Sequence, residues 1–153
     1  MRFYVDTSVF GGYFEAEFAE WTKPFIKQVM EGAFTIIISD ITLKEIGAAP
    51  LYVRELLTSI PQEFIEPARL ILEQESLAKH YISEGALTKK FESDAFHIAI
   101  ATTLKADSLV SWNFKHMVNF FRIRQYNAVM PDLIRYETWI CYNRYTHSKG
   151  GNL

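Results

Sequence analysis

The sequence has a single cysteine, no long hydrophobic run and no strong excess of one charge. With no second cysteine, Cys141 can form neither an internal disulfide nor a cysteine-based zinc site. The apolar stretch at residues 34–38 is far too short to span a bilayer. Asp6 comes too early for the preceding residues to serve as the apolar part of a secretory leader. We therefore expect a cytoplasmic protein that does not enter a membrane.

The chain also lacks internal repeats, low-complexity segments and a recognisable linker. Its 153 residues are 49% hydrophobic and 22% charged, which is an ordinary composition for a globular domain. We expect one domain over residues 1–145 and a disordered tail over residues 146–153.

The net charge of −2 conceals an uneven distribution of charge along the chain. Residues 1–92 contain 14 acidic and 9 basic side chains, whereas residues 93–153 contain 4 acidic and 7 basic ones. In the second part, basic and aromatic residues are interleaved: Phe120, Phe121, Arg122, Arg124, Tyr126, Arg135, Tyr136, Trp139, Arg144, Tyr145 and Lys149. Such a mixture suits a surface for phosphates and bases. Burial of the aromatic residues with solvated basic residues explains it equally well.

The hydrophobic pattern predicts strands that alternate with helices. The expected strands cover residues 2–5, 34–38, 108–112 and 136–142. The expected helices cover residues 22–32, 42–46, 53–59, 68–81, 93–105 and 116–126, and Phe14, Phe18 and Trp21 recur earlier at helical spacing. We expect the helix over 68–81 to end near Gly85. This alternation favours a parallel sheet covered on both faces.

Polar clusters follow three of these strands, at residues 6–8, 39–40 and 111–113. Ligands of parallel α/β sheets bind at the carboxyl ends of the strands, so these clusters mark a candidate site. Asp94 enters an alanine-rich, apolar helix, where an unpaired charge would be costly. Neighbouring carboxylates at such a place require a positive partner.

Four segments around these clusters resemble the PIN-domain family, in particular the VapC-like toxin ribonucleases of bacterial toxin–antitoxin pairs. They are YVDTSV at 4–9, SDITLKEI at 39–46, DAFHIAIA at 94–101 and ADSLVSWN at 106–113, and they occur in the family's order. The resemblance implies a three-layer α/β/α sandwich with a central, mainly parallel sheet.

The resemblance also implies a site for Mg²⁺ or Mn²⁺ formed by Asp6, Glu45 and Asp94. Asp40 is a rival for the position of Glu45, although it is also well placed to cap a helix. The family's fourth position, usually aspartate, falls on Asn113, whose amide can contribute an oxygen or orient a water molecule. We therefore expect one stably bound ion, with a second arriving only with the RNA phosphate.

Further residues near these positions are candidates for supporting roles. Ser8, Ser111 and Thr7 carry hydroxyls that can hold the acidic side chains by hydrogen bonds. His97 follows Asp94 by about one helical turn and is either a substrate contact or proton shuttle, or a buried core histidine. Lys115 and His116 are candidates for contact with a phosphate, or ordinary residues at a helix start.

The function implied is metal-dependent hydrolysis of RNA phosphodiester bonds by a toxin with an antitoxin partner, as a homodimer. One alternative is a catalytically weak or inactive PIN-fold module that binds RNA or protein, which the asparagine at 113 keeps open. Another is a phosphatase-like hydrolase with Asp6 as nucleophile, although Ser8 occupies the place of the second aspartate that such enzymes need.

Overall fold

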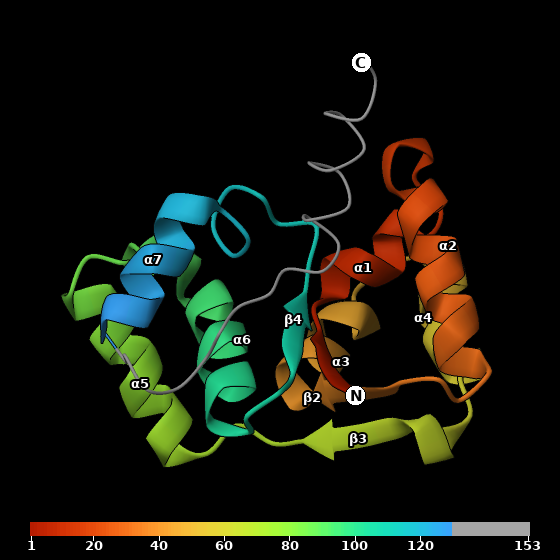
Figure 1. Cartoon of the computed structure of the whole chain (residues 1–153), viewed down its shortest axis with the longest axis horizontal. Helices are drawn as coiled ribbons and strands as arrows, with labels where there is room; N and C mark the ends of the chain where they lie inside the picture. The colour runs from red at the N-terminus through yellow and green to blue at the C-terminus, as the bar shows by residue number, and fades with distance from the viewer. Residues whose placement is uncertain (130–153) are drawn as a thin grey trace, which may run out of the picture.

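The computed structural model describes residues 1–129, which form an α/β fold around a parallel sheet (Figure 1). The strands of the described part are β1 (Arg2–Val5), β2 (Thr35–Ser39), β3 (Ile65–Ala68) and β4 (Ser108–Val110). They are arranged in the order β3-β2-β1-β4, and each neighbouring pair is parallel. In the register, Tyr4 of β1 lies between Ile37 of β2 and Leu109 of β4.

The helices that connect the strands are mostly short. The α-helices are α1 (Thr7–Gly12), α2 (Ala16–Met30), α3 (Asp40–Gly47), α4 (Leu51–Ser59), α5 (Leu72–Ser83), α6 (Glu92–Thr103) and α7 (Phe120–Val129). Two 3₁₀-helices, η1 (Gln62–Phe64) and η2 (Lys89–Phe91), precede β3 and α6.

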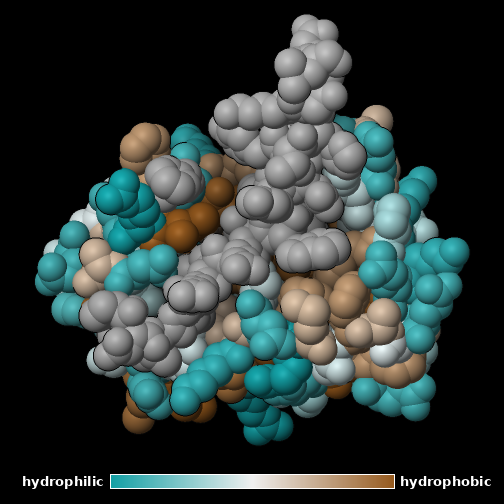
Figure 2. All heavy atoms as spheres, in the orientation of Figure 1, coloured by the Kyte–Doolittle hydropathy of each residue, from teal (hydrophilic) through white to brown (hydrophobic). Residues whose placement is uncertain are grey.

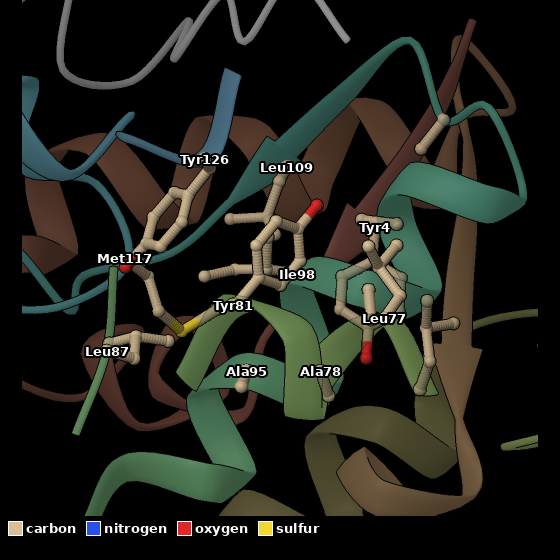
Figure 3. Close-up of a cluster of buried hydrophobic side chains, with 14 of the residues drawn as sticks. Tyr4, Leu77, Ala78, Tyr81, Leu87, Ala95, Ile98, Leu109, Met117 and Tyr126 are labelled. Carbon is tan, nitrogen blue, oxygen red and sulfur yellow. The ribbon is translucent and has the colours of Figure 1, made fainter. Parts of the chain in front are cut away.

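The sheet separates two hydrophobic cores, because successive side chains of a strand point to opposite faces. Tyr4 belongs to a cluster on one face that also contains residues of α5, α6 and α7 (Figure 3). Phe3 and Val5 pack on the other face with residues of α1, α2 and α4. Hydrophilic residues gather along the right-hand edge of the face seen in Figure 2, on the side of α2. The arrangement confirms the expected three-layer α/β/α class.

The helix expected to start at Thr22 begins earlier, and α2 runs without a break through Pro24. Proline lacks the N–H that would bond to the carbonyl of Glu20, four residues before it. Both residues are exposed, so water can hydrate this carbonyl. The solvent-facing position therefore lets the helix tolerate its proline, and Phe18 and Trp21 belong to the same helix.

The sequence prediction missed β3 and placed its last residue, Ala68, in a helix. The strand contains Pro67 and lies at the edge of the sheet, where a missing ladder donor is tolerated. The following helix starts only at Leu72. It ends as expected, because Gly85 adopts a positive φ of 75° just after the last turn.

The last described helix also starts later than predicted, at Phe120 rather than His116. The side-chain oxygen of Asn119 accepts from the backbone N–H groups of Phe121 and Arg122, which fixes the helix start. The predicted strand at 136–142 and the predicted tail at 146–153 lie outside the described residues.

Candidate metal centre

The site lies where β1 ends, next to the end of β4. The chain proceeds from β1 through β2 to β3 on one side and returns to β4 on the other. In parallel α/β sheets, such a reversal of strand order opens a crevice at the carboxyl ends of the strands. Asp6 directly follows β1 and Ser111 directly follows β4, so both lie at this reversal of strand order.

Asp6 is a buried carboxylate held by two serine hydroxyls. Its exposed fraction is only 6%. Its Oδ2 atom accepts hydrogen bonds from Ser8 Oγ at 2.6 Å and from Ser111 Oγ at 2.7 Å. The same two hydroxyls accept the backbone N–H groups of Trp112 and Asn113. The predicted supporting serines therefore tie Asp6 to the segment after β4.

Glu45 extends from α3 toward the same place. Its Oε2 accepts from Thr7 Oγ1 at 2.5 Å, and its Oε1 accepts from the hydroxyl of Ser93. Burial alone would raise the pKa of Glu45, but hydrogen bonds from His97, Ser93 and Thr7 outweigh it and lower the pKa to about 2. Glu45 is consequently a carboxylate across the neutral pH range.

Asp40, the rival for this position, is directed elsewhere. Its carboxylate is exposed and accepts the backbone N–H of Leu70. The cap of α3 is Ser39, whose hydroxyl accepts the backbone N–H of Thr42. Glu45, five residues beyond Asp40 and on another side of the helix, is therefore the α3 carboxylate that reaches the site.

His97 of α6 joins the carboxylates as a nearly inaccessible side chain, with an exposed fraction of 1%. Its Nε2 lies 3.2 Å from Glu45 Oε2 and 3.6 Å from Asp6 Oδ1. Burial alone would lower the pKa of His97, but the hydrogen bond with Glu45 and the charge of Asp6 raise it above its ordinary value. The one-turn spacing from Asp94 was the only sequence signal for this placement, and on that signal the sequence favoured a buried core histidine.

Asp94 and Asn113 form a pair beside this cluster. Asn113 Nδ2 donates to Asp94 Oδ1 at 3.0 Å, while Asn113 Oδ1 accepts the backbone N–H of His116. Burial raises the pKa of Asp94, and the charges of Asp6 and Glu45 add to this effect against the hydrogen bond from Asn113. Asp94 is thus close enough to Asp6 and Glu45 for their negative charges to raise its pKa.

The two candidate phosphate contacts have different surroundings. Lys115 is exposed. His116 is buried and stacks on Phe91 with a ring separation of 3.5 Å, and within residues 1–129 its Nδ1 atom has no hydrogen-bond partner. Burial lowers the pKa of His116, and the charge of Lys115 lowers it further. His116 is a neutral, packed imidazole at neutral pH.

Some of the interleaved basic and aromatic residues, those at positions 120–126, lie in the described part of the chain. Tyr126 is buried in the core, and its hydroxyl donates to the carbonyl of His116. Arg122 donates to the carbonyl of Ala86 at 2.6 Å. These two residues stabilise the α7 region, which supports the packing explanation for them. Arg135, Tyr136, Trp139, Arg144, Tyr145 and Lys149 lie outside the described residues.

The donor set suits a divalent cation. Within residues 1–129, Asp6, Glu45 and His97 each offer a ligand atom, and these atoms all lie within 4.8 Å of one another. Asp94 is not a member of this group of three, and its Oδ1 accepts the amide N–H of Asn113. Carboxylate oxygen and imidazole nitrogen are ordinary ligands for divalent metals. A buried Asp-Glu-His group that could bind a metal ion is therefore present.

No protein-family model matches the chain, and no curated protein matches it. Among solved structures, the chain is similar to one in the crystal structure of VapBC2 from Rickettsia felis bound to a DNA fragment from its promoter. The TM-score is 0.55 at 15% sequence identity, over 80% of this chain and 95% of that chain. The likeness is one of fold, and it agrees with a PIN-like sandwich.

The described part of the chain, residues 1–129, contains no helix with the length and apolar character needed to span a membrane.

Proposed function

We propose that the chain is a metal-dependent endoribonuclease whose site is formed by Asp6, Glu45 and Asp94. The observation that supports this most is the convergence of a buried carboxylate after β1 with side chains of α3 and α6. Buried acidic groups gathered at strand ends are costly without a compensating cation. Mg²⁺ or Mn²⁺ is the cofactor that this set fits.

Neighbouring polar side chains would hold the three carboxylates in position for a metal. Ser8 and Ser111 orient Asp6, and Thr7 orients Glu45, so the carboxylates are arranged before a metal binds. Asn113 holds Asp94 by its amide N–H. When bound, the metal would polarise the phosphate and lower the pKa of a water molecule.

We further propose that the chain is a PIN-family toxin that acts on RNA, pairs with an antitoxin and forms a homodimer. The order of the four sequence segments supports the family. The shared fold with a chain of a VapBC2 complex supports the association with a toxin–antitoxin pair. Lys115, which is exposed just after Asn113, is the residue we propose for contact with the RNA backbone.

The test is cleavage of end-labelled RNA by wild type and by Asp6→Asn, each with Mg²⁺, with Mn²⁺ and with EDTA. We expect metal-dependent cleavage by wild type and none by Asp6→Asn, Glu45→Gln or Asp94→Asn, with unchanged circular dichroism. Lys44→Gln, at an exposed position beside Glu45 on α3, is the matched control and should cleave like wild type. Equal cleavage by Asp6→Asn would indicate a contaminant or a different site.

A catalytically inactive module that binds RNA or protein is the second candidate. It is favoured by His97, which already places a basic side chain between Asp6 and Glu45. RNA binding that persists in EDTA, with no cleavage under any metal, would support it. Asn113→Asp would then show whether a fourth carboxylate confers activity.

A further inference from the structure

We propose that His97 Nε2 is a direct ligand of the bound metal, which makes the centre a mixed nitrogen and oxygen site that selects Mn²⁺ over Mg²⁺. The inference rests on the proposed metal dependence and goes beyond it, because the expected ligand set consisted of carboxylates alone.

The first support is the spacing of the ligand atoms. Ligand atoms that each lie about 2.1 Å from one ion are separated from each other by roughly 3 to 4 Å. His97 Nε2 lies 3.2 Å from Glu45 Oε2 and 3.6 Å from Asp6 Oδ1. The imidazole therefore already stands at ligand distance from both carboxylates.

The second support is a buried hydroxyl chain behind the imidazole. His97 Nδ1 lies 2.7 Å from the Tyr4 hydroxyl, which lies 2.7 Å from Ser39 Oγ. Ser39 Oγ lies 3.0 Å from Thr42 Oγ1, which donates to the Val5 carbonyl at 3.5 Å. Tyr4, Ser39 and Thr42 are all buried, so water does not compete for these contacts.

The end of this chain sets the direction of its hydrogen bonds. A carbonyl only accepts, so Thr42 donates to Val5, Ser39 donates to Thr42, and Tyr4 donates to Ser39. The Tyr4 oxygen is then the acceptor for the N–H of His97 Nδ1. In the metal-free site Nε2 donates to Glu45 Oε2, and a bound metal would take the place of that proton while Nδ1–H stays on the Tyr4 oxygen, which is how outer-sphere partners orient metal-binding histidines.

The nitrogen ligand determines which ions the site prefers. Mg²⁺ takes oxygen ligands and gives up its water reluctantly, whereas Mn²⁺, a first-row transition ion, is less strict and can take an imidazole nitrogen beside carboxylates. With His97 in the set, Mn²⁺ gains a ligand that Mg²⁺ uses poorly. We therefore expect a lower Kd for Mn²⁺ than for Mg²⁺.

The decisive measurement is electron spin echo envelope modulation of Mn²⁺ bound to the full chain, with isothermal titration for the Kd values. We expect modulation from one directly bound imidazole nitrogen in wild type, and its loss in His97→Gln. We also expect His97→Gln to weaken Mn²⁺ binding more than about tenfold and Mg²⁺ binding far less. His80→Gln, at an exposed position on α5, is the matched control and should leave both unchanged.

A second variant tests the hydroxyl chain. Tyr4→Phe removes the acceptor for Nδ1 and should weaken Mn²⁺ binding roughly tenfold, the usual effect of losing an outer-sphere partner. The nitrogen modulation should persist, because His97 itself remains.

The wild-type spectrum keeps the inference falsifiable even if His97→Gln fails to fold. Bound Mn²⁺ without imidazole modulation would overturn it, and His97 would then act only as a counter-charge for the carboxylates. RNA cleavage lost in Asp6→Asn would leave the proposed nuclease standing in that case. Failure of wild type to bind any metal would overturn both.

Discussion

Two serines next to Asp6 occupy equivalent positions, each linking the carboxylate to the backbone after β4. Both hydroxyls donate to the same oxygen, Oδ2, and each accepts one backbone N–H at 2.9 Å. Because Oδ2 is held in this way, Oδ1 is the atom that faces His97. The serines therefore determine which carboxylate oxygen is directed at the candidate ion.

Removal of either hydroxyl should destabilise the protein. Ser8→Ala and Ser111→Ala each leave a backbone N–H and a carboxylate oxygen short of a partner, so we expect each to lower the free energy of unfolding by about 1–3 kcal/mol. Urea denaturation measures this effect. Ser83→Ala, at an exposed position on α5, should change it by less than about 0.5 kcal/mol. Losses no larger than in this control would show that the hydroxyls do not hold Asp6.

At the scale of elements, Gly12 decides how closely α1 approaches α2 and Trp112. A Cβ atom at Gly12 would lie 2.7 Å from Trp112 Cδ1 and Nε1 and 3.1 Å from Phe18 Cβ. Trp112 cannot move freely, because its indole N–H donates to Thr22 Oγ1 at 3.0 Å. The absence of a side chain at Gly12 is thus required by the packing.

Gly12→Ala should therefore lower the free energy of unfolding by about 1–3 kcal/mol through overpacking. The adjacent Gly11 is an ideal comparison, because a Cβ there would meet only Glu15 Oε1 at 3.5 Å. Gly11→Ala should be neutral or stabilise the helix by up to about 1 kcal/mol. Thermal melts of both variants measure the difference, and equal effects would contradict this account of α1.

The edge strand β3 is attached to the rest of the sheet by a charged pair as well as by its ladder. Arg2 of β1 donates to both carboxylate oxygens of Glu66 in β3, at 2.6 and 2.8 Å, across the intervening β2. The hydrogen bond from Arg2 holds the pKa of Glu66 below its ordinary value. The pair is partly exposed, so its contribution is small.

This pair should produce a pH-dependent stability. A depressed pKa in the folded state gives a stabilisation that is present above the unfolded value and is lost as the pH falls through the folded value. The free energy of unfolding of wild type should exceed that of Glu66→Gln by up to about 1 kcal/mol at pH 7 and by less at pH 3. Denaturant titrations at both pH values test this, with the exposed Glu63→Gln as control. A difference that does not shrink in acid would contradict the assignment.

At the scale of the whole molecule, the site exists only in the folded chain. Asp6 follows β1, Glu45 lies on α3, and His97 lies on α6, so segments from three parts of the sequence must meet. A ligand of such a site binds the native state selectively and raises its stability by mass action.

Mn²⁺ at a hundredfold excess over its Kd should stabilise wild type by about 2.7 kcal/mol, which corresponds to a rise in Tm of roughly 5–10 °C. Asp6→Asn should show a much smaller rise. Thermal melts with and without EDTA measure both. An equal rise in the two proteins would mean that the metal binds somewhere else.

The sequence by itself determined the class of the fold and much of its element order. β1, β2, β4 and α6 follow from local patterns, because a run of apolar residues or a helix cap is readable wherever it occurs. The polar clusters at strand ends followed from the same patterns. The roles of Asp6, Glu45, Asp94 and Asn113 stay predictions that the experiments above address.

The tertiary structure alone decided β3 and the continuity of α2, because both depend on where a proline lies relative to neighbours and solvent. It also decided the position of His97. The sequence places this residue one helical turn after Asp94, but the contact with Glu45 depends on how α6 packs against α3. Side chains that are distant in sequence meet only through packing, and packing is what turned a histidine in an apolar helix into the third member of the cluster.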